Sequence, residues 1–163
     1  IYKSPNMVFN EKTRRYEPIL YALVTDILFT QEGTEITSST LPMQLSTNGV
    51  QKAYIESNNG GELFAREVAK KVRCQVETFF SHGNKEARII SGANGVMQSI
   101  VFPMGWETRW EKFYNQVDHF VRMFKANTHD DAADALTMVW EKEIAGGNTR
   151  PYGHQRRGVS RRN

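Results

Sequence analysis

The chain has 163 residues, which is the length of a single domain. Hydrophobic residues make up 39% of it and charged residues 24%, a globular composition that excludes an intrinsically disordered chain, collagen and a coiled coil. The formal net charge is +3, but residues 144–163 hold five arginines and no acid, so the first 143 residues carry −2. The positive charge belongs to the tail, and composition alone does not identify a nucleic-acid-binding protein.

Other features of the composition indicate the cellular compartment of the protein. No uncharged apolar run approaches the roughly 20 residues of a membrane-spanning helix, and the N-terminus has no signal-peptide pattern, so we expect no membrane partner. The single cysteine, Cys74, can form neither an internal disulfide nor a thiolate zinc site. We therefore expect a reducing, cytosolic compartment.

The first part of the chain predicts strands separated by a helical segment. Residues 1–18 show no clean period and predict a loop or a strand. Residues 19–30 are β-branched, aromatic and apolar, which predicts a buried strand. Residues 31–49 predict a loop and a short helix, and residues 53–56 a short strand. A Ser-Asn-Asn-Gly-Gly turn at 57–61 ends that strand.

The middle of the chain predicts one helix and several strands. A helix follows the turn, with four apolar residues on its buried side: Leu63, Phe64, Val68 and Val72. Residues 76–80 and 87–90 predict two strands. A glycine-rich turn at 92–95 leads to a third strand at 96–102.

Two helices close the predicted domain. The first spans residues 107–125, where apolar residues recur every three or four positions. The second begins near Thr128 and buries Leu136, Val139 and Trp140. Because strands and helices are mixed along the chain, we expect a layered α/β domain over residues 1–145. Residues 146–163 predict a basic, flexible tail.

Aspartates are rare in this chain and are clustered. Three of the five fall within five consecutive residues, as Asp130, Asp131 and Asp134. One interpretation is helix capping, with acids placed favourably at the start of a helix. The other is a metal site, because Asp131 and Asp134 share one helix face and Mg²⁺ prefers carboxylate oxygens. The spacing alone leaves both interpretations open.

Two other acids occupy positions that suit ligands. Glu56 ends a strand before a glycine-rich turn and a helix, where open α/β sheets place ligand sites. Taken alone, this position is better explained by a solvated strand-end glutamate before an Asn-Gly turn. Asp26 lies in the apolar run at 19–30, either as a further metal ligand or as an acid at a bend.

Basic residues offer candidate contacts to phosphates. Lys85 and Arg88 follow a turn and either face a nucleic-acid backbone or are solvated surface charges. Arg156 and Arg157 belong to the basic tail, which either contacts phosphates without sequence preference or only keeps the chain soluble.

A series of motifs occurs along the chain in one order. These motifs are Tyr54–Gly61 (Tyr-Ile-Glu-Ser-Asn-Asn-Gly-Gly), Phe64–Arg66, Asn84–Ile89, Phe102-Pro103 and His129–Leu136 (His-Asp-Asp-Ala-Ala-Asp-Ala-Leu). The series resembles the C-terminal nuclease domain of the large terminase subunit of tailed bacteriophages. The resemblance covers roughly residues 19–143, and its first and last motifs are specific as a pair.

The resemblance implies a ribonuclease H-like fold, in which a central mixed β-sheet is flanked by α-helices. It also implies a metal-dependent endonuclease that cuts concatemeric double-stranded viral DNA during packaging. In the full-length subunit the partners are an ATPase motor domain, the portal and the small terminase subunit, at the procapsid in the host cytoplasm. This chain has no phosphate-loop motif, so we expect no ATP hydrolysis from it.

The resemblance also implies roles for individual residues. Glu56 matches the second acidic ligand of the family, and Asp131 matches the third, with Asp134 and Asp130 as partners beside it. These residues would hold two divalent cations, Mg²⁺ or Mn²⁺, for phosphodiester hydrolysis. Asp26 is a further candidate ligand.

The family's first catalytic aspartate stands on an initial strand, upstream of the strand predicted at 19–30, and no aspartate precedes Asp26 in this chain. We therefore expect the first strand to be missing and the isolated chain to be crippled as a nuclease. Two alternatives stay open: a resolvase or transposase relative of the same fold, and a non-catalytic module that binds DNA or the portal.

Overall fold

The computed structural model describes residues 1–11, 13–120 and 130–145. The chain divides into two compact units. The first unit contains residues 1–25 together with those from Lys85 onward, and the second unit contains residues 26–84. Each unit has its own sheet and its own helices.

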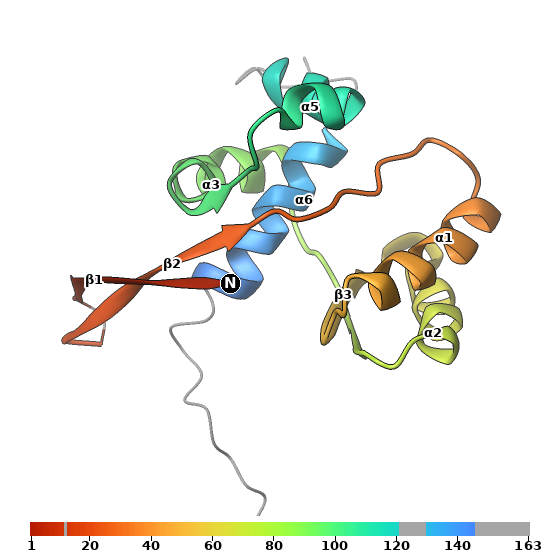
Figure 1. Ribbon diagram of the computed structural model, residues 1–163, viewed down its shortest axis with the longest axis horizontal. Helices are drawn as coiled ribbons and strands as arrows, with labels where there is room; N and C mark the ends of the chain where they lie inside the picture. The colour runs from red at the N-terminus through yellow and green to blue at the C-terminus, as the bar shows by residue number, and fades with distance from the viewer. Residues whose placement is uncertain (12, 121–129, 146–163) are drawn as a thin grey trace, which may run out of the picture. The chain divides into compact units, whose positions relative to one another are not determined.

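The first unit is built on a mixed three-stranded sheet with the order β1-β2-β5. Strand β1 (Tyr2–Asn10) pairs antiparallel with β2 (Arg15–Leu23), and the two form the long ribbon labelled in Figure 1. The short strand β5 (Ile100–Val101) pairs parallel with the end of β2.

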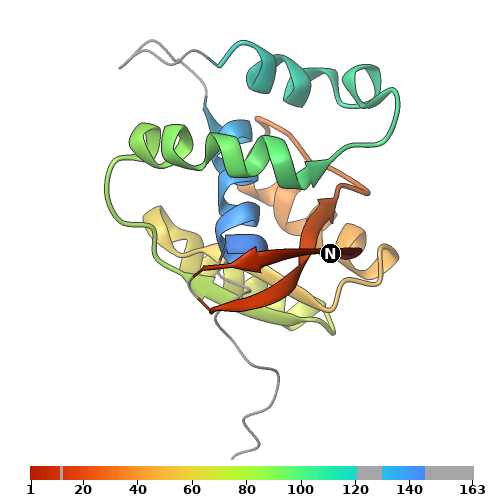
Figure 2. The same ribbon diagram turned by 90° about the vertical axis from the view of Figure 1, so that its left-hand side faces the viewer.

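Four helices complete the described part of the first unit. They are α3 (Lys85–Ser99), α4 (Trp106–Arg109), α5 (Glu111–Asp118) and α6 (Asp131–Val139), and α6 continues into a π-helical segment, η2 (Trp140–Ala145). Helix α3 packs on α6 and on η2, and Figure 2 shows α3 crossing α6. The buried apolar side chains of this unit are Ala22, Ile89, Ile100, Phe113, Ala132 and Leu136.

Two glycines set the contact between α3 and the α6–η2 segment. A Cβ at Gly92 would lie 2.8 Å from Cγ2 of Thr137, and one at Gly95 would overlap the indole ring of Trp140. Thr137 is itself 1% exposed. Glycine weakens a helix interior by about 1 kcal/mol relative to alanine, so these residues serve the close packing of α3 rather than its helicity.

The second unit is a β-α-β arrangement with one additional helix. Strands β3 (Lys52–Glu56) and β4 (Gln75–Phe79) form a separate parallel two-stranded sheet. Helix α2 (Gly61–Lys71) connects them, follows the 3-10 turn η1 (Asn58–Gly60), and packs on both strands. Its buried residues are Ala65 and Val68, so of the predicted buried side only Val68 is confirmed. Leu63 is 68% exposed, and Val72 is the C-cap residue, one position past the helix. Helix α1 (Thr34–Thr47) packs on α2.

The predicted strands at 87–90 and 96–102 and the turn at 92–95 are wrong, because residues 85–99 form the single helix α3. Only Ile100 and Val101 of the third segment are in a strand. The apolar run at 87–90 is too short to distinguish a strand from a buried helix face, and the two glycines that suggested a turn serve helix packing instead. Ile89 and Gly92 are three residues apart and share the buried face of α3.

Other element boundaries also differ from the prediction. The strand expected at 19–30 is shorter and earlier, since β2 ends at Leu23 and residues 24–30 have no regular structure. The helix expected at 107–125 is interrupted at Trp110, whose φ of −129° and ψ of 53° are not helical, and residues 121–125 lie outside the described part. The tail at 146–163 also lies outside the described residues.

The α/β class is confirmed: the described residues contain a mixed three-stranded sheet, a separate two-stranded sheet and six α-helices. Where the structure describes the chain, none of its helices has both the length and the apolar character needed to cross a lipid bilayer.

We expect Gly95→Ala to lower the free energy of unfolding by about 1–3 kcal/mol, because the added methyl group must displace the Trp140 ring. Urea denaturation would measure the loss. Gly33→Ala is the matched control, since a Cβ at Gly33 meets nothing within 4 Å. Equal stability of the two variants would contradict the close packing of α3 on Trp140.

Candidate functional site

The three clustered aspartates lie at the start of α6. Asp130 is the N-cap residue, and Asp131 and Asp134 belong to the first turn. The Asp130 side chain makes no capping hydrogen bond, so capping does not account for this carboxylate. Asp134 is buried, whereas the Asp131 side chain is 73% exposed. The cluster therefore reaches from the interior of the first unit to its surface.

One ammonium group meets all three carboxylates. Nζ of Lys85, the first residue of α3, lies 2.6 Å from Oδ1 of Asp130 and 2.7 Å from Oδ1 of Asp131. It lies 3.8 Å from Oδ2 of Asp134. Lys85, which the sequence offered as a phosphate contact, is thus the counter-ion of the aspartate cluster in this structure.

A second cation holds the buried member of the cluster. Nη2 of Arg88 donates to Oδ1 of Asp134 at 2.6 Å, and Nε donates to the same oxygen at 3.2 Å. The side chains are 15% and 6% exposed, so this ion pair is largely shielded from water. The pair joins α3 to α6, and its burial gives Arg88 a structural role rather than a place on an open surface.

The charge of Lys85 is stabilised by its neighbours. Partial burial by itself lowers the pKa of the ammonium, but hydrogen bonds to Asp130 and Asp131 and the negative charges of both carboxylates outweigh it. The net pKa of Lys85 is raised, so the group is a permanent cation at neutral pH.

The donor set suits a hard divalent cation, because Mg²⁺ and Mn²⁺ prefer carboxylate oxygens and three of these already face one cationic group. As the side chains stand, no group of three or more acidic, histidine or cysteine residues in the described part is placed to hold a metal ion. The oxygens are arranged around Lys85 instead. In this structure the three carboxylates are therefore the ion-pair partners of an ammonium group.

Glu56 is the last residue of β3 in the second unit, and Asn58 holds its carboxylate. Nδ2 of Asn58 donates to Oε1 of Glu56 at 2.8 Å and to the carbonyl oxygen of Ser81 at 3.1 Å. The backbone N–H and the Oγ of Ser57 both donate to the carbonyl oxygen of Phe79, at 2.8 and 2.9 Å. The segment after β3 is thereby tied to the end of β4, which fixes the orientation of Glu56.

A cavity of about 320 Å³ opens beside Glu56. Its lining comes from the start of α1, the end of β3 and the start of α2, and includes the polar side chains of Glu32, Thr34, Thr37, Glu56 and Asn58. Gly61 is needed at this position, because a Cβ there would overlap the carbonyl oxygen of Glu56. The expected placement of Glu56 at a strand end before a turn and a helix is observed.

Asp26 has partners of its own in the second unit. Its Oδ2 accepts from Nε2 of Gln44 at 2.7 Å and from Nδ2 of Asn48 at 3.1 Å, and its Oδ1 accepts from the backbone N–H of Ile27 at 2.9 Å. Asp26 lies outside any strand, and these bonds tie it to the C-terminal end of α1. They give it the structural role that the sequence left as one of two interpretations.

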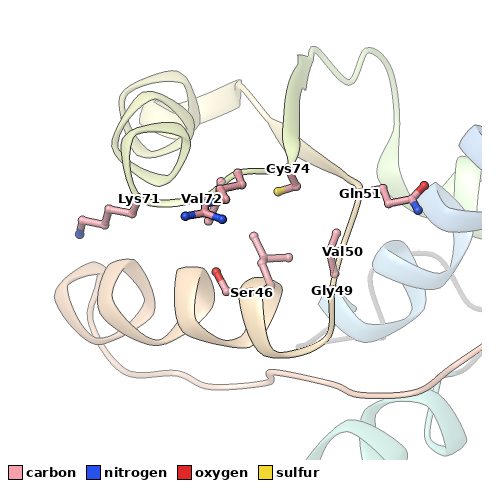
Figure 3. A pocket seen from close by; sticks show the side chains of 9 residues that line it. Ser46, Gly49, Val50, Gln51, Lys71, Val72 and Cys74 are labelled. Carbon is pink, nitrogen blue, oxygen red and sulfur yellow. The ribbon is translucent and has the colours of Figure 1, made fainter.

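A larger cavity of about 660 Å³ lies between the ends of α1 and α2 (Figure 3). Leu45, Val50 and Val72 are among its apolar lining residues, and the side chain of Cys74 faces it. No sequence pattern predicts this cavity, because its lining comes from two short segments that are 20 residues apart.

The candidates in the tail, Arg156 and Arg157, lie outside the described residues. No protein-family model and no curated protein matches the chain. The functional argument therefore rests on the residues and their geometry.

We expect the three aspartates to differ in their effect on stability. Asp134→Ala removes the buried carboxylate that accepts two hydrogen bonds from the Arg88 guanidinium and should lower the free energy of unfolding by about 3–5 kcal/mol. Asp131→Ala removes an exposed carboxylate and should cost less than about 1 kcal/mol. Urea denaturation would compare them, and equal losses would contradict a structural Arg88–Asp134 pair.

We also expect Asn58→Asp to destabilise the second unit more than Asn58→Ala. Alanine only removes the donor that joins Glu56 to Ser81, a loss of about 1–2 kcal/mol. Aspartate adds a negative charge beside the Glu56 carboxylate as well. Thermal unfolding at pH 7 would test the order, and equal losses from the two variants would contradict it.

Proposed function

We propose that this chain is the metal-dependent nuclease domain of a viral DNA-packaging terminase, as its resemblance implies. This domain hydrolyses phosphodiester bonds of double-stranded DNA, and we expect the isolated chain to do so weakly because the family's first catalytic aspartate has no counterpart in it. The observation that carries the proposal is the convergence of three carboxylates on one cation position at the start of α6. Carboxylate oxygens are the ligands that the divalent cations of phosphoryl-transfer enzymes commonly use.

Under this proposal the acidic residues divide the work of holding Mg²⁺ or Mn²⁺. Asp131 is the most exposed ligand of the cluster, with Asp130 beside it. Asp134 is oriented by Arg88, and Glu56 is oriented by Asn58. When bound, the cations supply a water of lowered pKa and stabilise the leaving oxygen. Arg88 acts by positioning Asp134, not by contacting DNA.

The proposal includes a ribonuclease H-like fold. A parallel β3-α2-β4 arrangement that ends β3 on an acidic residue supports it, as does a mixed sheet followed by helices that carry further acids. Glu56 stands at the carboxyl end of a parallel strand, where α/β proteins commonly bind ligands.

The proposed partners follow from the same resemblance. Double-stranded DNA is the substrate, and the five arginines of residues 144–163 would contact its phosphates in a salt-dependent way. In the full-length subunit we expect an ATPase motor domain, the portal and the small terminase subunit as protein partners, in the host cytoplasm.

A non-catalytic DNA- or portal-binding module is the second candidate. One observation favours it: Lys85 and Arg88 already form ion pairs with the three aspartates, so the cluster serves as an ion-pair network between two helices. This candidate predicts DNA binding that does not depend on divalent cations.

Nicking of supercoiled plasmid in Mn²⁺ and in Mg²⁺ would test the proposal. We expect a chelator to abolish cutting, and Asp131→Ala and Glu56→Gln to lower the rate at least 100-fold while both variants stay folded. Lys112→Ala, at an exposed position on α5, is the control and should cut normally. DNA binding by the folded chain without any cutting would favour the second candidate.

A further inference from the structure

We propose that the cavity between the ends of α1 and α2 binds a small amphiphilic carboxylate, that is, a molecule with an apolar body and one anionic head group. All of its lining residues belong to the second unit. The inference is independent of the proposed function, because the lining includes neither the clustered aspartates nor Glu56.

The cavity has the size and the apolar surface of a ligand site. Its volume of about 660 Å³ falls within the range of roughly 300–1,000 Å³ that small-molecule sites occupy. Leu45, Val50 and Val72 line it with aliphatic side chains, and each of them is only half-buried. An apolar body placed against these side chains would remove more of their surface from water, which favours binding.

Backbone hydrogen bonds hold the walls of the cavity in place. The N–H of Val50 donates to the carbonyl oxygen of Leu45 at 3.0 Å, which folds the chain back against the end of α1. The N–H of Gln75 donates to the carbonyl oxygen of Gln51 at 2.9 Å, which joins the two segments that line the cavity. A ligand therefore meets a preformed site and does not have to order it.

The charge of the lining selects an anionic head group. Lys71 and Arg73 both line the cavity, and none of the lining residues that the structure describes is acidic. Nζ of Lys71 donates to the carbonyl oxygen of Ser38 at 3.0 Å. Arg73 is exposed and has no hydrogen bond or ion pair to any residue in the described part of the chain. Its guanidinium can therefore donate two parallel hydrogen bonds to one carboxylate.

The helix ends at the cavity oppose an anion but do not outweigh these two cations. Both α1 and α2 end there, and a helix C-terminus carries about half a negative charge. The two ends together offset about one of the two positive charges. The remaining charge of about +1 matches a single carboxylate.

The unmodified chain contains its own reporter of occupancy. Cys74 is the only cysteine of the sequence, and its side chain faces the cavity (Figure 3). Because alkylation requires an accessible thiol, we expect saturating octanoate to slow the reaction of Cys74 with N-ethylmaleimide about fivefold or more, as measured by intact mass spectrometry. Acetate lacks the apolar body and 1-octanol lacks the charge, so each should slow the reaction less than about twofold.

Two outcomes of this experiment would overturn the proposal. Unchanged alkylation in octanoate would show that the cavity does not hold the probe. Equal protection by 1-octanol would show that the cavity takes apolar molecules without recognising a carboxylate.

A variant tests the head-group contact directly. We expect Arg73→Gln to weaken octanoate binding about tenfold, as measured by isothermal titration calorimetry, because it removes a charge-assisted hydrogen-bond donor. The variant should fold normally, since Arg73 is exposed and makes no contact of this kind with the described residues. Lys70→Gln removes the same charge from an exposed position on α2 outside the lining and should change the affinity less than about twofold. Equal affinities of Arg73→Gln and the unmodified chain would contradict the assignment of Arg73.

Discussion

The ion pairs between α3 and α6 are the interaction on which the candidate site depends. Lys85 and Arg88 are one helical turn apart on α3, and both reach the aspartates at the start of α6. The buried pair, Arg88 with Asp134, fixes one helix against the other, and the more exposed pair leaves Asp130 and Asp131 within reach of solvent. A single set of opposite charges therefore joins the two helices at its buried end and leaves two carboxylates accessible to solvent at its exposed end.

The fold could be predicted where local pattern and tertiary role agree. Three consecutive elements could be recognised from their sequence patterns. A short apolar run predicts the strand that ends at Glu56, a glycine pair predicts the turn after it, and a helical period predicts the helix that buries Val68. Helix α3 could not be recognised, because Gly92 and Gly95 break the helical propensity of the sequence. They are explained only by Thr137 and Trp140, which lie more than 40 residues later in the chain.

The acidic residues of the candidate site could be predicted from the sequence, but the partners of its two cationic residues could not. The aspartates were visible as a cluster in a chain that has few of them. The partners of Lys85 and Arg88 were not visible, because each is 46 residues from Asp131 or Asp134 and no local pattern relates them. From sequence, Lys85 and Arg88 could be interpreted only as solvated charges or as phosphate contacts. In the structure both form ion pairs between two packed helices.

The glycines of α3 also bear on the precision of the aspartate cluster. Where two helices meet through interleaved flexible side chains, their separation can adjust by changes of rotamer. Here the backbone of α3 lies directly against a rigid indole ring and a fully buried threonine. Changes of rotamer can therefore alter the separation of the two helices very little. This close contact between uncharged residues restricts how far the distance between the lysine on α3 and the carboxylates on α6 can vary.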